Sequence, residues 1–169
     1  MSDRLVRASP LTQAALAPFG EVIEARGEPS FQINQGMCDR FHDLARVEVA
    51  DAEGAPGISI GHGRPYTLPL ACRMVERHPM GSQAFIPLGP DPFLVVVAPD
   101  EDGIPGRPLA FLTAPGQGVN YHRGTWHGVL TPLGRPQSFL IVDRVGPGTN
   151  LVEHFYDAPW TITAEPAAG

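Results

Sequence analysis

The pattern of hydrophobic and polar positions indicates a chain built mainly of short β-strands. Apolar residues recur in brief runs or at alternate positions, and Gly or Pro separates most of these segments. The longest apolar run, residues 93–98, is far too short to cross a bilayer. The predicted strands cover residues 31–36, 38–49, 57–60, 71–76, 83–88, 93–98, 109–113, 118–122, 137–143 and 151–156.

One short helix is predicted near the N-terminus. Ser9 can cap it, Pro10 suits its first position, and residues 11–16 offer an apolar side before Pro18. Many short strands with little helix predict a mainly β sandwich or closed barrel, in which alternate residues face inward and can line a pocket. We expect a single domain over residues 1–169, with a tail after about residue 160 that is either loose or packed on a partner.

Composition and charge narrow the function classes. The chain has 169 residues, with 19 Gly and 19 Pro that follow no period, which favours frequent turns over a fibrous or low-complexity protein. The net charge is −6, and its 12 basic residues are scattered arginines, which argues against nucleic-acid binding. No apolar segment predicts a membrane anchor or a signal peptide, and two cysteines are too few for a disulfide scaffold. The cytoplasm is the simplest location.

A first polar cluster lies in residues 76–83. Glu76 and His78 are two positions apart, so on a strand their side chains point to the same side, and Gln83 returns after a short turn. A carboxylate, an imidazole and an amide oxygen that converge inside a barrel would suit a divalent metal. The alternative is a polar hairpin end in which His78 is hydrogen-bonded to its neighbours.

A second cluster occupies residues 116–127. His122 and His127 flank a glycine turn, and Tyr121 precedes them with an aromatic ring that can exclude water. Tyrosine and histidine together offer an acid, a base and hydrogen-bond donors near neutral pH. A surface loop with two ordinary histidines is the alternative.

A third feature is the segment Arg40-Phe41-His42-Asp43. Arg40 and His42 share one side of an extended chain, and the planar guanidinium of an arginine can hold both oxygens of a substrate carboxylate. A surface salt bridge is the alternative reading.

The first two clusters together resemble the paired motifs of the cupin superfamily. Where the first motif usually has His-x-His and a later Glu, this chain has Glu76, His78 and Gln83. The second motif is matched by Gly116, Gly124 and His127. The resemblance implies a cupin-like double-stranded β-helix, or jelly-roll barrel, with a metal held by Glu76, His78, Gln83 and His127. Because a carboxylate replaces one imidazole and a neutral amide replaces the glutamate, the expected metal is a weakly held divalent transition ion such as nickel or manganese.

A narrower resemblance is to the bacterial ureidoglycolate lyases. Four segments match the family's order and spacing, and the likeness extends from about residue 5 to 156; the segments are residues 31–36, 40–45, 76–87 and 116–122. The resemblance implies a homodimer that acts on a small molecule in allantoin degradation for nitrogen supply. It also implies a carbon–nitrogen lyase of the amidine-lyase type, which cleaves (S)-ureidoglycolate into glyoxylate and urea.

The site residues then take provisional roles. His122, Tyr121 and His127 are the expected acid–base residues, while Arg40, His42 and Asn120 are expected to bind the substrate. Two other functions remain open on the sequence alone: a ureidoglycolate amidohydrolase that releases ammonia, and a barrel that binds a metabolite as a sensor without catalysis.

Overall fold

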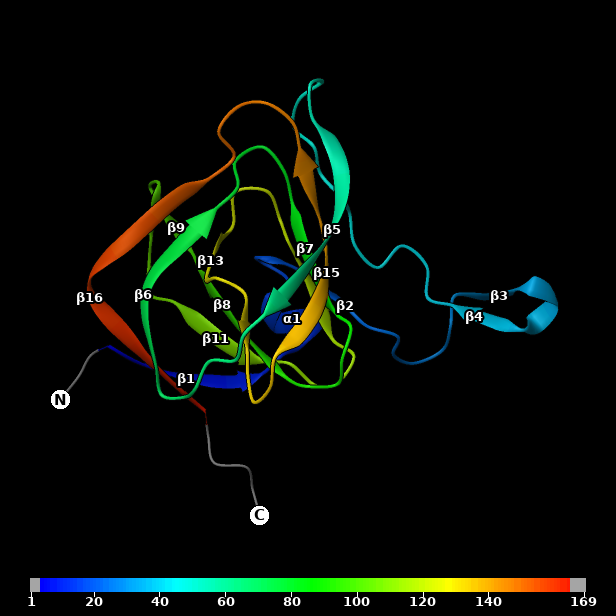
Figure 1. Cartoon of the computed structure of the whole chain (residues 1–169), viewed down its shortest axis with the longest axis horizontal. Coiled ribbons are helices and arrows are strands. Elements are labelled where there is room, and N and C mark those ends of the chain that lie inside the picture. The colour runs from blue at the N-terminus through cyan, green and yellow to red at the C-terminus, as the bar shows by residue number, and fades with distance from the viewer. Residues whose placement is uncertain (1–3, 165–169) are drawn as a thin grey trace, which may run out of the picture.

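Two β-sheets and one short helix form the body of the protein in this computed structural model, which describes residues 4–164 (Figure 1). The first sheet has the strand order β11-β1-β16-β6-β13-β8-β14, and an added β11–β8 pairing closes six of its strands into a barrel. Its strands are β1 (Leu5–Pro10), β6 (Leu70–Arg77), β8 (Phe93–Ala98), β11 (Leu109–Leu112), β13 (Trp126–His127), β14 (Thr131–Pro132) and β16 (Val152–Ala164). The mainly β, cupin-like fold predicted from the sequence is confirmed.

The second sheet is antiparallel and packs against the first. Its order is β2-β12-β7-β15-β5, so β5 is an edge strand. The strands are β2 (Gly20–Ile23), β5 (Ala55–Gly63), β7 (Gln83–Pro87), β12 (Gly118–Tyr121) and β15 (Gln137–Val145). A small separate pair joins β9 (Asp100–Glu101) to β10 (Ile104–Pro105).

Strand β8 separates two hydrophobic cores, which explains its continuous apolar sequence. Phe93, Val95 and Val97 pack in one core with residues of the second sheet, including Phe85 and Phe139. The alternate residues of β8, from Leu94 to Ala98, pack in the other core with residues of the first sheet. A strand buried on both faces has no polar side, so its pattern is a run rather than an alternation.

The N-terminal helix is shorter and begins later than the sequence predicts. Ser9 and Pro10 are the end of β1, where they pair with β11, and neither caps the helix. Thr12 is the N-cap, because its side-chain oxygen accepts a hydrogen bond from the Ala15 amide at 3.1 Å. The helix α1 is the single turn Gln13–Leu16. The prediction missed β1 because its extended pairing outweighs the local preference of Pro10 for a helix start.

The C-terminal strand continues past residue 160, where the sequence predicts a tail that is loose or packed on a partner. In β16, Thr161 and Ile162 pair with Ala71 and Leu70 on one side, and residues up to Ala164 pair with β1 on the other. The remainder of that predicted tail, residues 165–169, lies outside the described residues. Within the described part of the chain, no helix is long and apolar enough to span a membrane.

A hairpin extends away from the two sheets, and we call residues 26–46 the arm (Figure 1). It contains β3 (Phe31–Ile33), the 3-10 turn η1 (Asn34–Gly36) and β4 (Cys38–Arg40). The strand predicted over residues 38–49 is therefore paired at its start, in β4, and again at its end, where the Val49 backbone bridges to Gly81 on the body.

Gly20 provides a test of the close contact between β2 and β12. A Cβ at this position would overlap the backbone carbonyl oxygen of Asn120, which cannot move without disturbing the sheet. We expect Gly20→Ala to lower the free energy of unfolding by at least about 1 kcal/mol, as overpacking typically does. Gly61→Ala is the control, because its Cβ would meet only the end of the Ile141 side chain at 2.9 Å. Urea denaturation of both variants checks this, and equal stabilities would contradict it.

Candidate active site

The two predicted metal-binding segments meet at one end of the space between the sheets. Glu76 lies near the end of β6, and His127 in β13 is its direct cross-strand partner. His78 follows in the turn that leads to Gln83 at the start of β7. Strand pairing thus brings together residues that are about 50 positions apart in the chain, which spacing within either segment cannot indicate.

His127 is the most deeply buried member of the cluster, with 1% of its surface exposed. Its Nδ1 lies 2.9 Å from the Gly128 carbonyl oxygen, to which it must donate a hydrogen, so Nε2 carries a lone pair. No described residue forms a hydrogen bond with Nε2. The ring stacks on Tyr121 with centroids 4.3 Å apart, and burial lowers the pKa of His127 to about 3. His127 is therefore a neutral imidazole with an unused acceptor atom.

His78 is held in the matching tautomer. Its Nδ1 lies 2.7 Å from the carbonyl oxygen of Asn150 and donates to it, which leaves Nε2 as an acceptor. That Nε2 faces Gln83 Oε1 at 3.1 Å and Glu76 Oε1 at 3.8 Å. Gln83 is oriented in turn by Asp143, whose Oδ2 accepts from Gln83 Nε2 at 3.0 Å. For neutral His78, three acceptor atoms thus face one another with no donor between them.

These residues fit a divalent metal ion. One ligand atom from each of Glu76, His78 and His127 lies within 4.8 Å of the others, and Gln83 Oε1 borders the same space. Converging lone pairs repel one another unless a cation lies between them. Each imidazole donates its other nitrogen to a backbone carbonyl, which is the usual support of a metal-binding histidine. Burial raises the pKa of Glu76, against the opposing effect of His78, so a cation here would also stabilise that carboxylate.

Two further groups can take part in proton transfer beside the cluster. Burial and the nearby Glu76 carboxylate raise the pKa of Tyr121 far above its usual value, so its phenol stays protonated and can donate. The other group is Asp143, which is not among the site residues predicted from the sequence. Its cross-strand pairing with Gln83 directs it into the cluster. The alternation of inward- and outward-facing residues along β15 could have indicated that Asp143 points inward.

Asn120 and His122 lie on the other face of β12 from Tyr121. Asn120 Nδ2 donates to Glu21 Oε2 at 2.8 Å and to the Arg46 carbonyl oxygen at 2.9 Å. His122 Nε2 lies 3.2 Å from the other oxygen of Glu21. The structure therefore does not bring Asn120 and His122 to the cluster of Glu76, His78, Gln83 and His127, although the sequence analysis assigns them to the same site.

Arg40 and His42 lie in the arm, away from the cluster of the same chain (Figure 1). Both pack against Phe31: the guanidinium carbon of Arg40 is 5.8 Å from the centre of that ring, and the His42 ring is 5.3 Å from it. The Asp43–Arg46 ion pair, at 2.9 Å, is also local to the arm. Within one chain, the predicted carboxylate anchor and the predicted metal ligands are separate.

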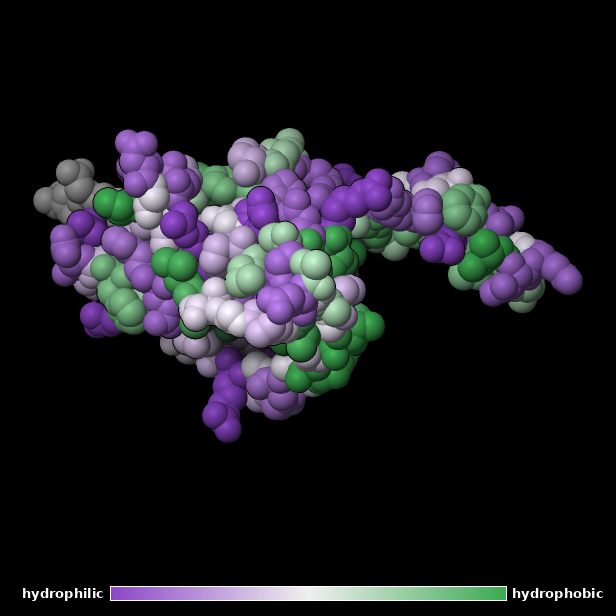
Figure 2. All heavy atoms as spheres, turned by 90° about the horizontal axis from the view of Figure 1, so that it is seen from above, coloured by the Kyte–Doolittle hydropathy of each residue, from purple (hydrophilic) through white to green (hydrophobic). Residues whose placement is uncertain are grey.

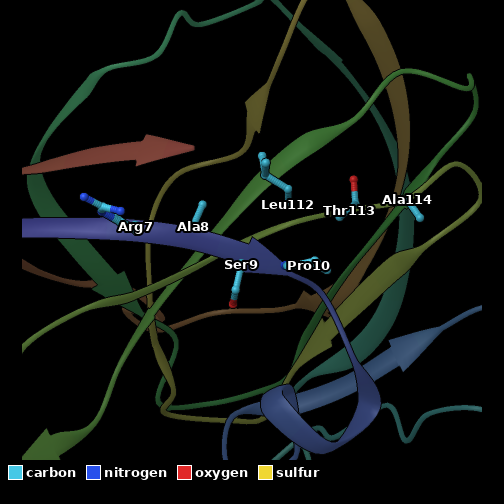
Figure 3. Close-up of a pocket in the computed structure, with 7 residues that line it drawn as sticks. All are labelled: Arg7, Ala8, Ser9, Pro10, Leu112, Thr113 and Ala114. Carbon is cyan, nitrogen blue, oxygen red and sulfur yellow. The ribbon is translucent and has the colours of Figure 1, made fainter. Parts of the chain in front are cut away.

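A surface recess of about 440 Å³ lies elsewhere, at the parallel junction of β1 and β11 (Figure 3). It is lined by Arg7, Ala8, Ser9, Pro10, Leu112, Thr113 and Ala114. Its lining includes none of the cluster residues, and apart from Arg7 it offers no charged side chain. The recess therefore lacks the acid–base and metal-binding groups of the cluster, and the space between the sheets remains the candidate active site.

Comparison with known proteins gives a consistent result. A model of the family described as "Ureidoglycolate lyase" matches residues 3–163. The chain is 60% identical to a ureidoglycolate lyase of Chelativorans sp. over 94% of its own length and 96% of that protein. It is 56% identical to ureidoglycolate lyase 2 of Rhizobium meliloti and 49% identical to a ureidoglycolate lyase of Pseudomonas paraeruginosa. These alignments cover 90% and 96% of the chain, and 94% and 97% of the relatives.

Proposed function

The chain belongs to the ureidoglycolate lyase family, and from this premise we propose that its inter-sheet cluster cleaves (S)-ureidoglycolate into glyoxylate and urea. The reaction is a step of allantoin degradation that recovers purine nitrogen. The observation that carries the proposal is the convergence of Glu76, His78, Gln83 and His127, whose buried Nε2 has no partner among the described residues, beside a protonated phenol.

The substrate sets the chemical requirements. One carbon of ureidoglycolate bears a hydroxyl, a carboxylate and a urea nitrogen. Cleavage removes the hydroxyl proton, converts the C–O bond to a carbonyl, and breaks the C–N bond so that the nitrogen leaves with a new proton. A base is needed at the hydroxyl, a donor at the departing nitrogen and a cation at the carboxylate.

The residues beside the cluster can meet the first two requirements. We assign the hydroxyl proton to the Asp143 carboxylate, which Gln83 holds in place, and the donor role to the Tyr121 hydroxyl. Glu76, His78, Gln83 and His127 would hold a divalent ion such as nickel or manganese, which supplies Lewis-acid stabilisation of negative charge on the substrate oxygen. The stacked rings of Tyr121 and His127 would exclude water from this side of the substrate. Assembly as a homodimer in the cytoplasm remains a prediction from the sequence.

The products distinguish this reaction from hydrolysis of the ureido group. Fresh ureidoglycolate is incubated with the protein, and urea, ammonia and glyoxylate are measured separately. We expect one urea for each glyoxylate, because collapse of the hydroxyl-bearing carbon needs only acid–base assistance. Two ammonia for each glyoxylate, in a preparation free of urease, would instead establish the amidohydrolase. Tight binding of ureidoglycolate without turnover would favour the sensor.

A further inference from the structure

The cluster has carboxylates but lacks a cation from the arginines next to it. Arg77 follows Glu76, yet its guanidinium pairs with Asp100 at 2.9 Å and lies 4.3 Å above the Trp126 ring. Arg144 follows Asp143, yet its Nε pairs with Asp51 at 2.6 Å on the other side of the strand.

The alternation of each strand therefore turns the acid inward and the arginine away. Because ureidoglycolate is an anion and neither of these two described arginines faces the cluster, its carboxylate needs an anchor from another part of the structure.

The arm lacks support from its own chain. Each of its strands has three residues, and an isolated two-stranded hairpin is marginal in water. The side-chain hydrogen bonds of residues 26–45 stay within the arm, such as Gln32 to Asp39 and the His42 amide to Ser30. Met37 at its tip is 86% exposed and Phe31 is 44% exposed. A projecting segment with apolar side chains and an ordered arginine is suited to packing against another molecule.

The body offers an apolar surface on the side from which the arm projects (Figure 2). Ile58 and Ile60 lie on the same face of the edge strand β5, with 76% and 61% of their surfaces exposed. An exposed apolar edge strand is normally covered. Every copy of the chain carries both the arm and this surface, so a two-fold pair of copies can cover both with one repeated contact.

We infer that two copies of this chain exchange arms, and that Arg40 of each copy anchors the substrate carboxylate at the metal-binding cluster of the other. The inference rests on the proposed function, and it deepens it by naming the missing cation. Opposite charges favour the arrangement, because Arg40 would enter a site that bears Glu76 and Asp143. Phe31 holds the guanidinium in place through the ring contact at 5.8 Å, so little side-chain freedom is lost on binding.

Mixed dimers test whether Arg40 acts across the interface. One copy carries Arg40→Ala and the other His127→Phe, each with its own tag, and tandem purification yields the heterodimer. Each homodimer is inactive or weak; for Arg40→Ala we expect a loss of about ten- to a hundredfold in kcat/KM. The heterodimer contains one intact cluster and one intact arm on different copies. We expect about half of the wild-type activity, since one of two sites is complete.

Activity no higher than that of the two homodimers would show that Arg40 acts within its own chain or not at all, and would overturn the inference. Wild-type activity in Arg40→Ala, or a monomeric wild-type protein in solution, would do the same. Arg26→Ala, an exposed arginine in the same arm, is the matched control and should keep wild-type activity.

A cross-linking test separates this inference from the proposed reaction, because it needs no substrate. Cys38 is exposed in the arm, and Val152 is exposed at the start of β16, where it pairs with Arg77 beside the cluster. In Val152→Cys, a short bismaleimide should join Cys38 to the new thiol of the partner and give a covalent dimer in a denaturing gel. The double variant with Cys38→Ser should not form this band. A monomer band alone in Val152→Cys would contradict arm exchange, even if the protein cleaves ureidoglycolate.

Discussion

Replacing His127 by phenylalanine should remove both the bound metal and the activity. The neutral Nε2 of His127 is buried and without a hydrogen-bond partner among the described residues, so a ligand role is the use the structure leaves for it. Phenylalanine keeps the ring that stacks on Tyr121. We expect kcat/KM to fall by more than about a hundredfold, since losing even a residue that only orients a metal ligand typically costs about 10- to 100-fold. Metal content by mass spectrometry and initial rates of glyoxylate formation are the measurements.

The control for this variant is His62→Ala. His62 is an exposed histidine whose Nδ1 contacts the Ser138 hydroxyl at 3.0 Å, away from the cluster. It should leave both metal content and kcat/KM unchanged. Circular dichroism should show that His127→Phe is folded. A folded His127→Phe protein that retains wild-type activity would refute the metal-binding role, as would full activity of wild-type protein shown to contain no metal.

The β fold could be predicted from the sequence because each turn and each strand has its own local pattern, and these patterns recur along the chain. Turns rich in Gly and Pro, and strands with alternate apolar residues, are readable one segment at a time. The N-terminus was harder, because Ser9 and Pro10 have a good local pattern for a helix start and yet pair with β11. That pairing depends on Phe111 and Leu112, about 100 residues away in the chain. The local conformational preferences of Ser9 and Pro10 therefore cannot predict it.

The candidate site was predictable to the extent that neighbouring residues share a face. Glu76 and His78 were grouped correctly by their spacing, and the cross-strand partner of Glu76 is His127. The group of Asn120, Tyr121 and His122 was divided by the same alternation, because Tyr121 faces the cluster while its two neighbours face Glu21. Asp143 enters the site through its pairing with Gln83, which only the sheet order provides.

Acid should destabilise the metal-free protein through His127. Burial lowers the pKa of this imidazole to about 3, whereas in the unfolded chain it is near the usual value of about 6.5. Between these two values the unfolded chain binds a proton that the folded protein excludes. The free energy of unfolding therefore falls as the pH decreases through this window. The expected loss from His127 is about 3 kcal/mol between pH 7 and pH 4, at about 1.4 kcal/mol for each pH unit well inside the window.

The comparison that isolates this contribution is wild type against His127→Phe, both stripped of metal with a chelator. Other groups titrate in the same range, and Glu76 acts in the opposite sense because its raised pKa makes the folded protein take up a proton first. Such groups are present in both proteins, so their effects largely cancel in the difference. Urea denaturation at pH 7 and pH 4 should show wild type losing about 3 kcal/mol more than the variant. Equal losses would mean that His127 gains its proton in the folded state, as an imidazole open to water would.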